Sequence, residues 1–131
     1  MSDLDDDEDI WVSYLDKDGE WTKAQHMGRP WNNKTYNWVL NISPDGNVML
    51  SSQYDTDGSY LGNGFSISRR GINGWTLPEN MTILEYKNKE STVDFFVSGD
   101  LQTALISVNG KKSRGGHDLY VCFRINQNTF F

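Results

Sequence analysis

The sequence predicts an all-β protein, and three observations lead to this prediction. First, apolar bursts of only a few residues are interrupted by turns, as in NISPDGNVMLSSQYDTDGSYLGNGFSISRRGINGW, which begins at Asn41. Gly and Asn accept the positive φ of tight hairpin turns, whereas Val, Ile, Phe and Trp favour a pleated sheet. Second, residues 36–42 alternate with period two, and every second residue from Tyr36 to Ile42 is a large apolar one on the same face. Third, helical patterns are nearly absent.

Three segments share one internal pattern of a short apolar strand, a polar turn and an aromatic residue. They are DIWVSYLDKDGEW from Asp9, GFSISRRGINGW from Gly64 and HDLYVCFRINQNTF from His117. We assign Ser13, Ser68 and Cys122 to the same position of this pattern, because they are 55 and 54 residues apart. Trp21 and Trp75 form a further pair at the shorter of these two spacings. A common period of this kind predicts a repeat architecture.

A second set of positions has the same period. The segment NISPDGNVMLSS matches FVSGDLQTALIS through three pairs of residues that are each 55 apart: Ser43 and Ser98, Asp45 and Asp100, and Leu50 and Leu105. Because two independent sets of positions share one period, we interpret the similarity as a repeat of about 55 residues.

A repeat of this length with four strand-like segments has the size of one β-propeller blade. The predicted strands of the complete copy are residues 36–42, 48–53, 65–69 and 75–81. The predicted fold is therefore a partial propeller of about two and a half blades, each a four-stranded antiparallel sheet. The predicted boundaries are 1–33 for a partial blade with third and fourth strands, 34–88 for a complete blade and 89–131 for an incomplete blade.

The number of blades has a consequence, because closed propellers contain about four to eight of them. Two and a half blades are too few for a closed ring, which leaves three arrangements: the chain is a piece of a longer protein, several chains complete one ring, or the blades form an open stack. In the last two, apolar blade faces drive self-association, since solvent penalises them by about 25 cal/mol per Å². We favour the first.

The motifs resemble those of a known family. SPDG from Ser43, DIWVS from Asp9, DLYV from Asp118 and WTLP from Trp75 are similar to the WD-like propeller repeat of the TolB and PD type. The resemblance covers residues 9–130, although SGDL at residues 98–101 replaces SPDG. It implies a bacterial cell-envelope protein, periplasmic or associated with the outer membrane as in OmpA-associated proteins, with a protein partner in the envelope.

Composition narrows the functional classes. The net charge of −6 argues against a nucleic-acid partner. No apolar run of about 18 residues is present, which argues against membrane insertion. The acidic start MSDLDDDED contains no targeting signal, and Cys122, as the only cysteine, excludes an internal disulfide.

Calcium is the one cofactor that the sequence suggests. Asp55 and Asp57 in DTDGS, echoed by DKDGE at residues 16–20, alternate like the oxygen ligands of a calcium loop. Neither run has the complete D-x-[DN]-x-[DN]-G-x5-E pattern. We therefore favour a turn whose Asp side chains cap backbone amides, with no metal and no other cofactor.

Binding residues are expected in two long loops, 54–63 and 109–117, that correspond to each other one repeat apart. Trp31 and Tyr60 are candidates for stacking on a glycan. Lys111, Arg114 and His117 are the candidates in the second loop. Catalysis has little support, because no G-x-S-x-G motif occurs and no metal-ligand spacing links the histidines to Cys122.

We therefore predict a non-enzymatic binding or scaffold module. Two alternatives stay open. The first is a propeller domain of a larger serine hydrolase or peptidase, and the second is a glycan-binding module that uses Trp31 and Tyr60.

Overall fold

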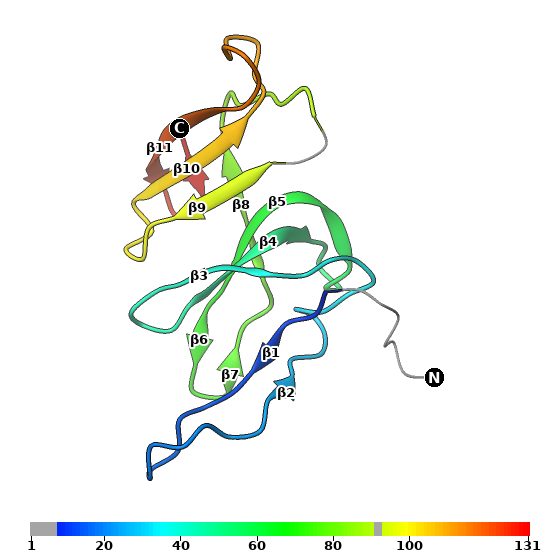
Figure 1. The fold of residues 1–131 in the computed structure, drawn as a ribbon, viewed down its shortest axis with the longest axis vertical. Helices are drawn as coiled ribbons and strands as arrows, with labels where there is room; N and C mark the ends of the chain where they lie inside the picture. Colours follow the sequence, from blue (N-terminus) through cyan, green and yellow to red (C-terminus); the bar gives the residue numbers. More distant parts are fainter. Residues whose placement is uncertain (1–7, 91–92) are drawn as a thin grey trace.

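The computed structural model describes residues 8–90 and 93–131, which fold into strands and turns without a helix (Figure 1). The strands in these ranges are β1 (Trp11–Val12), β2 (Gln25–His26), β3 (Val39–Ile42), β4 (Val48–Tyr54), β5 (Tyr60–Ser68), β6 (Arg70–Gly71), β7 (Gly74–Trp75), β8 (Glu79–Ile83), β9 (Asp94–Val97), β10 (Thr103–Val108), β11 (Asp118–Asn126) and β12 (Thr129–Phe130). The all-β prediction is confirmed. None of the described residues belongs to a helix that could cross a membrane.

One eight-stranded sheet contains most of the chain, in the order β3-β4-β5-β8-β12-β11-β10-β9. It consists of two antiparallel units, which we call the first meander (β3, β4, β5, β8) and the second meander (β9, β10, β11, β12). They are joined by the parallel pair β8–β12, with Thr82 opposite Thr129. At the other end of the sheet, Asn41 Nδ2 donates to Val97 O over 2.7 Å, so the sheet is nearly closed.

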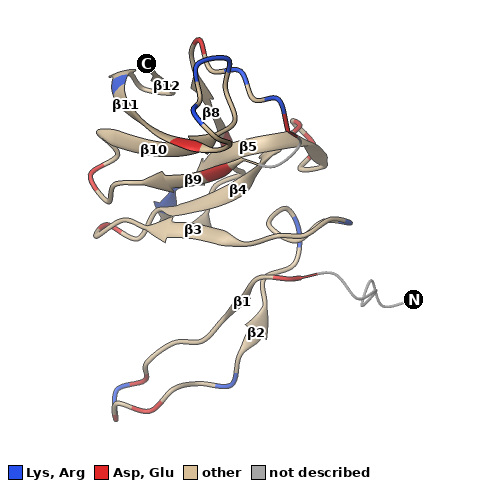
Figure 2. Ribbon diagram, turned by 45° about the horizontal axis from the view of Figure 1, so that its top comes forward, with Lys and Arg blue, Asp and Glu red and all other residues tan. Residues whose placement is uncertain are grey.

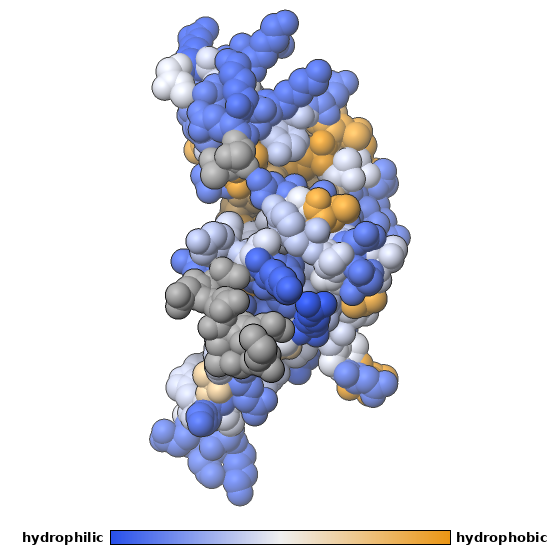
Figure 3. All heavy atoms as spheres, turned by 90° about the vertical axis from the view of Figure 1, so that its right-hand side faces the viewer, coloured by the Kyte–Doolittle hydropathy of each residue, from blue (hydrophilic) through white to orange (hydrophobic). Residues whose placement is uncertain are grey.

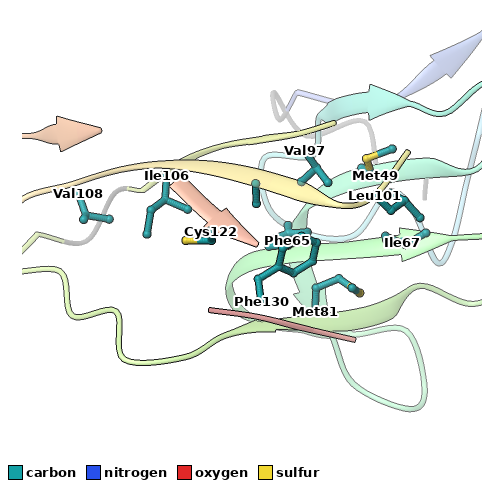
Figure 4. Close-up of a cluster of buried hydrophobic side chains, with 11 residues drawn as sticks. Met49, Phe65, Ile67, Met81, Val97, Leu101, Ile106, Val108, Cys122 and Phe130 are labelled. Atoms are coloured by element: carbon teal, nitrogen blue, oxygen red, sulfur yellow. The ribbon is translucent and has the colours of Figure 1, made fainter. Parts of the chain in front are cut away.

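The central core lies between the two meanders (Figure 4). The buried residues of this central core are Met49, Phe65, Ile67, Met81, Val97, Leu101, Ala104, Ile106, Val108, Cys122 and Phe130. The rings of Phe65 and Phe130 meet edge to face with centroids 5.7 Å apart, and both side chains are almost completely buried. Phe65 belongs to the first meander and Phe130 to the second, so this contact joins the two meanders. Buried aromatic side chains supply a large share of core stability.

The strand pairing of the first meander recurs in the second with the longer spacing found in the sequence. Three pairs of β4 and β5 recur in β10 and β11: Val48–Ser68 as Thr103–Phe123, Met49–Ile67 as Ala104–Cys122, and Leu50–Ser66 as Leu105–Val121. Cys122 therefore corresponds to Ile67 and not to Ser68, which corrects the assignment made from the sequence. A slip of one residue moves a side chain to the other face of a sheet, and Cys122 indeed lies in the central core.

This register also shows which faces meet. Met49 and Ala104 correspond, and both side chains lie in the central core. Corresponding faces of the two meanders are therefore packed against each other, whereas the rotation that relates neighbouring propeller blades would bring opposite faces together. The arrangement as two and a half propeller blades stays a prediction.

The first turn of each meander uses the same side-chain chemistry. Ser43 Oγ donates to the Asp45 carboxylate and accepts from Asn47 N over 3.1 Å. Ser98 Oγ donates to Asp100 over 2.6 Å and accepts from Thr103 N over 3.0 Å. These bonds, which include an ionised partner, stabilise the turn before β4 and the turn before β10.

The two turns differ at the position that requires a positive φ. Gly46 has φ 83° in the first turn, and Leu101, at the corresponding position of the second turn, has φ 60°. A left-handed conformation costs about 1–2 kcal/mol for a residue with a side chain. Leu101 is only 7% exposed and belongs to the central core, so its burial offsets this cost.

A second cluster covers the other face of the first meander. It consists of Ile10, Trp31, Val48, Leu50 and Tyr54. The N-terminal segment, residues 8–38, thus packs on the β4 and β5 side that faces away from the central core, and its strands β1 and β2 form a separate hairpin.

Several strand limits differ from the prediction. β3 begins at Val39 and not at residue 36, and a bulge lies between Val39 and Asn41. Tyr36, Trp38 and Ile42 are exposed, and of the expected apolar face only Leu40 packs against the central core. The predicted strand 75–81 is divided between β7 and β8, because residues 76–78, which include Pro78, separate them.

Candidate functional site

The loop at residues 54–63 is a self-contained turn. Thr56 N donates to Asp55 Oδ1 over 2.7 Å, and Ser59 N donates to Asp57 Oδ1 over 2.8 Å. Hydrogen bonds from Ser59 hold the pKa of Asp57 below its usual value. Both carboxylates thus accept amides of their own turn. Throughout residues 8–90 and 93–131, no three His, Cys, Asp or Glu side chains gather as metal ligands would.

Trp31 is buried and not presented to solvent. Its exposed fraction is 5%, and its ring meets that of Trp75 edge to face at 5.2 Å. Trp31 Nε1 donates to Ser68 Oγ over 3.2 Å, and Tyr54 Oη donates to Trp31 O over 3.0 Å. The indole face that would stack on a sugar is part of the second cluster, which corrects the expectation for Trp31.

Tyr60 is the exposed member of the predicted glycan-binding pair. Its exposed fraction is 41%, and its hydroxyl donates to Asn63 Oδ1 over 2.7 Å. The ring stands on β5 rather than in a loop, since β5 begins at Tyr60. Because Trp31 is buried, the predicted pair offers only the ring of Tyr60 for stacking on a sugar.

The loop at residues 109–117 is tied to the connection between β8 and β9. Glu90 accepts from Asn109 Nδ2 over 2.9 Å and lies 2.9 Å from His117 Nε2. Arg114 contributes its backbone N–H, which donates to Asp118 Oδ2 over 2.9 Å. The hydrogen bonds from Asn109 and then from His117 hold the pKa of Glu90 below its usual value. His117 is therefore an anchor of the loop in this structure.

A cleft opens beside this loop. Its volume is about 350 Å³, within the range of ligand pockets. The lining residues are Ile83, Leu84, Glu85, Tyr86, Lys87, Ile106, Val108, Gly110, Lys111, Lys112, Tyr120, Val121 and Cys122. Because apolar side chains line it while Lys87, Lys111 and Lys112 stand at its edge, we call it the lysine-rimmed cleft. Figure 2 shows basic residues gathered on the loops beyond β8 and β10.

Burial affects two of the titratable groups that line the cleft. Burial raises the pKa of the Cys122 thiol and of the Tyr86 hydroxyl. A thiol with a raised pKa is a poor nucleophile at neutral pH, because little thiolate is present. Cys122 is therefore a poor candidate for a nucleophile.

The outer face of the second meander is apolar and open to solvent. On β11 every second side chain from Leu119 to Ile125 is at least half exposed. Phe96 of β9 is 51% exposed and continues this surface, since Leu105 pairs with both Phe96 and Val121. We define the outer face as Phe96, Leu105, Leu119, Val121, Phe123 and Ile125. Figure 3 shows apolar surface in the upper half of the molecule, where the second meander lies.

Sequence reasoning identified the loop containing Lys111, Arg114 and His117, but it missed both surfaces next to that loop. The cleft has walls from residues 83–87 and from β11, far apart in the sequence. The alternation from Leu119 to Ile125 was visible in the sequence, although it did not reveal which face is covered.

Comparisons of the chain with known protein families, with curated proteins and with solved structures found no match.

Proposed function

We propose that the chain is a non-enzymatic protein-binding module of the bacterial cell envelope, and that its outer face docks onto an apolar surface of a partner. The observation that carries this proposal is the difference between two corresponding leucines. Leu50 is completely buried under the N-terminal segment, whereas Leu105 on the outer face is half-buried. Contiguous exposed apolar surface of this kind is typical of interaction sites.

The kind of partner follows from what covers the first meander. Ile10 and Trp31, which both lie outside the strands of the N-terminal segment, pack with Val48 and Leu50. The outer face consists of the corresponding positions of the second meander. It has the large apolar side chains of Val121 and Phe123 where the first meander has Ser66 and Ser68. A covering element with aromatic and branched side chains is therefore the complementary surface.

We also propose that the N-terminal segment and the two meanders are two and a half copies of one repeat. Recurrent hydrogen bonds support this. Ser13 Oγ donates to Thr22 O, and Ser68 Oγ donates to Thr76 O one period later in the chain. The envelope location and the TolB-like relationship are carried by the sequence motifs alone.

Solution mass and dye binding test the docking function. A second copy of the chain serves as the probe, because an apolar face of this size associates with itself when no other partner is present. We expect concentration-dependent dimers in sedimentation velocity and binding of an apolar fluorescent dye. The variant F96K/F123K should remain monomeric, bind little dye and keep its unfolding midpoint. A wild-type chain that is monomeric at all concentrations and binds no dye would refute the proposal.

The glycan-binding alternative loses its main residue, because Trp31 is buried. The hydrolase-domain alternative gains no observation from the described residues.

A further inference from the structure

We propose that the lysine-rimmed cleft is a slot for an extended peptide, which adds as a strand to β11 and has acidic residues after its apolar part. This site shares Val121 with the outer face, but it uses the backbone edge of the second meander, so the proposal does not depend on the docking function.

The edge of β11 that borders the cleft has no strand beside it. β10 pairs with Asp118 to Phe123 along one edge of β11. On the other edge, β12 pairs with Arg124 and Asn126, and Phe123 exchanges backbone hydrogen bonds of 2.8 and 2.9 Å with Phe131. Within the described ranges, no strand continues this pairing to Val121 or Leu119. Backbone groups alternate along an antiparallel strand, so those of Val121 and Leu119 point to the same side as those of Phe123.

In the first meander the corresponding edge is occupied. β8 pairs with β5 there, with Asn80 opposite Ser66 and Met81 opposite Phe65. Ser66 corresponds to Val121, because both stand opposite corresponding leucines of β4 and β10. The cleft thus lies where the second meander lacks the strand that the first one has, with Leu84 to Lys87 as its opposite wall.

The lining of the cleft suits a strand. The apolar residues Ile83, Ile106 and Val108 line the cleft, where alternate side chains of an added strand would be buried. Strand addition obtains affinity from main-chain hydrogen bonds and specificity from such pockets. A peptide strand therefore satisfies both the open backbone edge and the apolar interior.

The charge at the rim indicates the flank of the peptide. Lys87, Lys111 and Lys112 take part in none of the ion pairs of the described residues, in a chain whose net charge is −6. Lys111 and Lys112 precede the first residue of β11. A strand antiparallel to β11 points its C-terminal end toward that first residue, as β8 does on β5. Complementary acidic residues are thus expected after the apolar part of the peptide.

The probe is a synthetic peptide with the sequence of residues 76–83, TLPENMTI, followed by two aspartates. This is the strand that occupies the corresponding place in the first meander. In an NMR titration of the labelled chain, we expect shifts at Leu119, Val121 and Cys122, and slower hydrogen exchange of the Val121 amide once the peptide is bound. N-methylation of the peptide residue opposite Val121 should abolish binding, whereas N-methylation of the next residue should weaken it much less.

A charge-reversal variant tests the rim. K87E/K111E/K112E should weaken binding of the acidic peptide by about tenfold or more and leave the unfolding midpoint nearly unchanged, because all three side chains are exposed. The matched control K17E/K23E/K34E changes the net charge equally, at exposed lysines of the N-terminal segment, and should bind normally. F96K/F123K should also bind the peptide, which separates this site from the outer face.

Three results would overturn the proposal. One is the absence of any shift with the peptide. Another is an equal effect of N-methylation at both positions, which would exclude strand pairing. The third is tight binding of dodecanoate, a fatty acid, in the cleft, combined with a failure of the peptide to displace it and to protect the Val121 amide. This result would make the cleft a small-molecule pocket.

Discussion

The two meanders share their strand order and pairing register, but they differ in what surrounds them. The first meander is covered on both faces, by the central core and by the N-terminal segment, and β8 occupies the edge of β5. The second meander is covered on one face only, and part of the β11 edge is open. The same local architecture is thus complete in one half of the molecule and incomplete in the other. The incomplete half is where we expect a partner.

The largest expected effect is a contrast between two corresponding leucines. Leu50→Ala should lower the free energy of unfolding by about 3 kcal/mol, because it empties a fully buried site. Leu105→Ala should cost about 1 kcal/mol or less, since solvent or a partner already contacts the site. Urea denaturation of both variants measures this contrast. Equal losses would mean that the outer face is covered in the isolated chain and would break the comparison.

The second contrast concerns the tryptophans of two hairpins. Trp75 Nε1 donates to Gly46 O over 3.0 Å, and the guanidinium of Arg70 lies 4.8 Å from the centre of its ring. Trp21 is 71% exposed. Trp75→Ala should therefore cost about 2 kcal/mol and Trp21→Ala close to none. Thermal unfolding of both variants would measure these costs, and a large loss for Trp21→Ala would reveal a contact of that ring in solution.

The third prediction tests a similarity between the meanders. Ser43→Ala and Ser98→Ala should each cost about 1 kcal/mol, because each removes hydrogen bonds with the backbone and with an Asp of the same turn. The bond from Ser43 lowers the pKa of Asp45, and the bond from Ser98 lowers the pKa of Asp100. NMR titration should show both pKa values rise toward 3.8 in the variants. A rise in only one variant would contradict the shared turn chemistry.

The smallest effect is a pH dependence that arises from Glu90, in the connection between β8 and β9. The pKa of Glu90 is lowered in the folded chain from its ordinary value of 4.5. Its stabilising contribution is therefore present above pH 4.5 and is lost as the pH falls through the lowered pKa. Wild type should unfold at a slightly higher temperature than Glu90→Gln at neutral pH, and at the same temperature well below pH 4.5. An unchanged difference at low pH would refute the role of this carboxylate.

Much of the local structure could be predicted from the sequence. The strands around Val48 and Phe65 and the turn at Ser43 follow from alternation and turn chemistry, which are properties of neighbouring residues. The period found in the sequence recurs in the strand pairs of the two meanders. Asp55 and Asp57 also bind their own turn, as the favoured interpretation stated.

The remaining features depend on distant parts of the chain. The register of β11 decides whether Cys122 faces the core, and alignment by similar residues placed it one position away. Trp31 follows Pro30 in a stretch with the composition of a surface loop, yet Trp75 and Ser68 bury it. The lysine-rimmed cleft forms where residues 83–87 face β11. Periodicity in the sequence does not specify such contacts, since they are set by tertiary packing.

The parallel pair between β8 and β12 has a consequence for the order of folding. Thr82 and Thr129 lie far apart in the chain, so their pairing closes a long loop, and the entropy of this closure is lost before the contact stabilises anything. Each meander, in contrast, is built from hairpins between neighbouring strands. The hairpins should therefore form early, and Phe130 should complete its packing in the core only after the rate-limiting step. Variants of Phe130 are then expected to change the rate of folding less than the rate of unfolding.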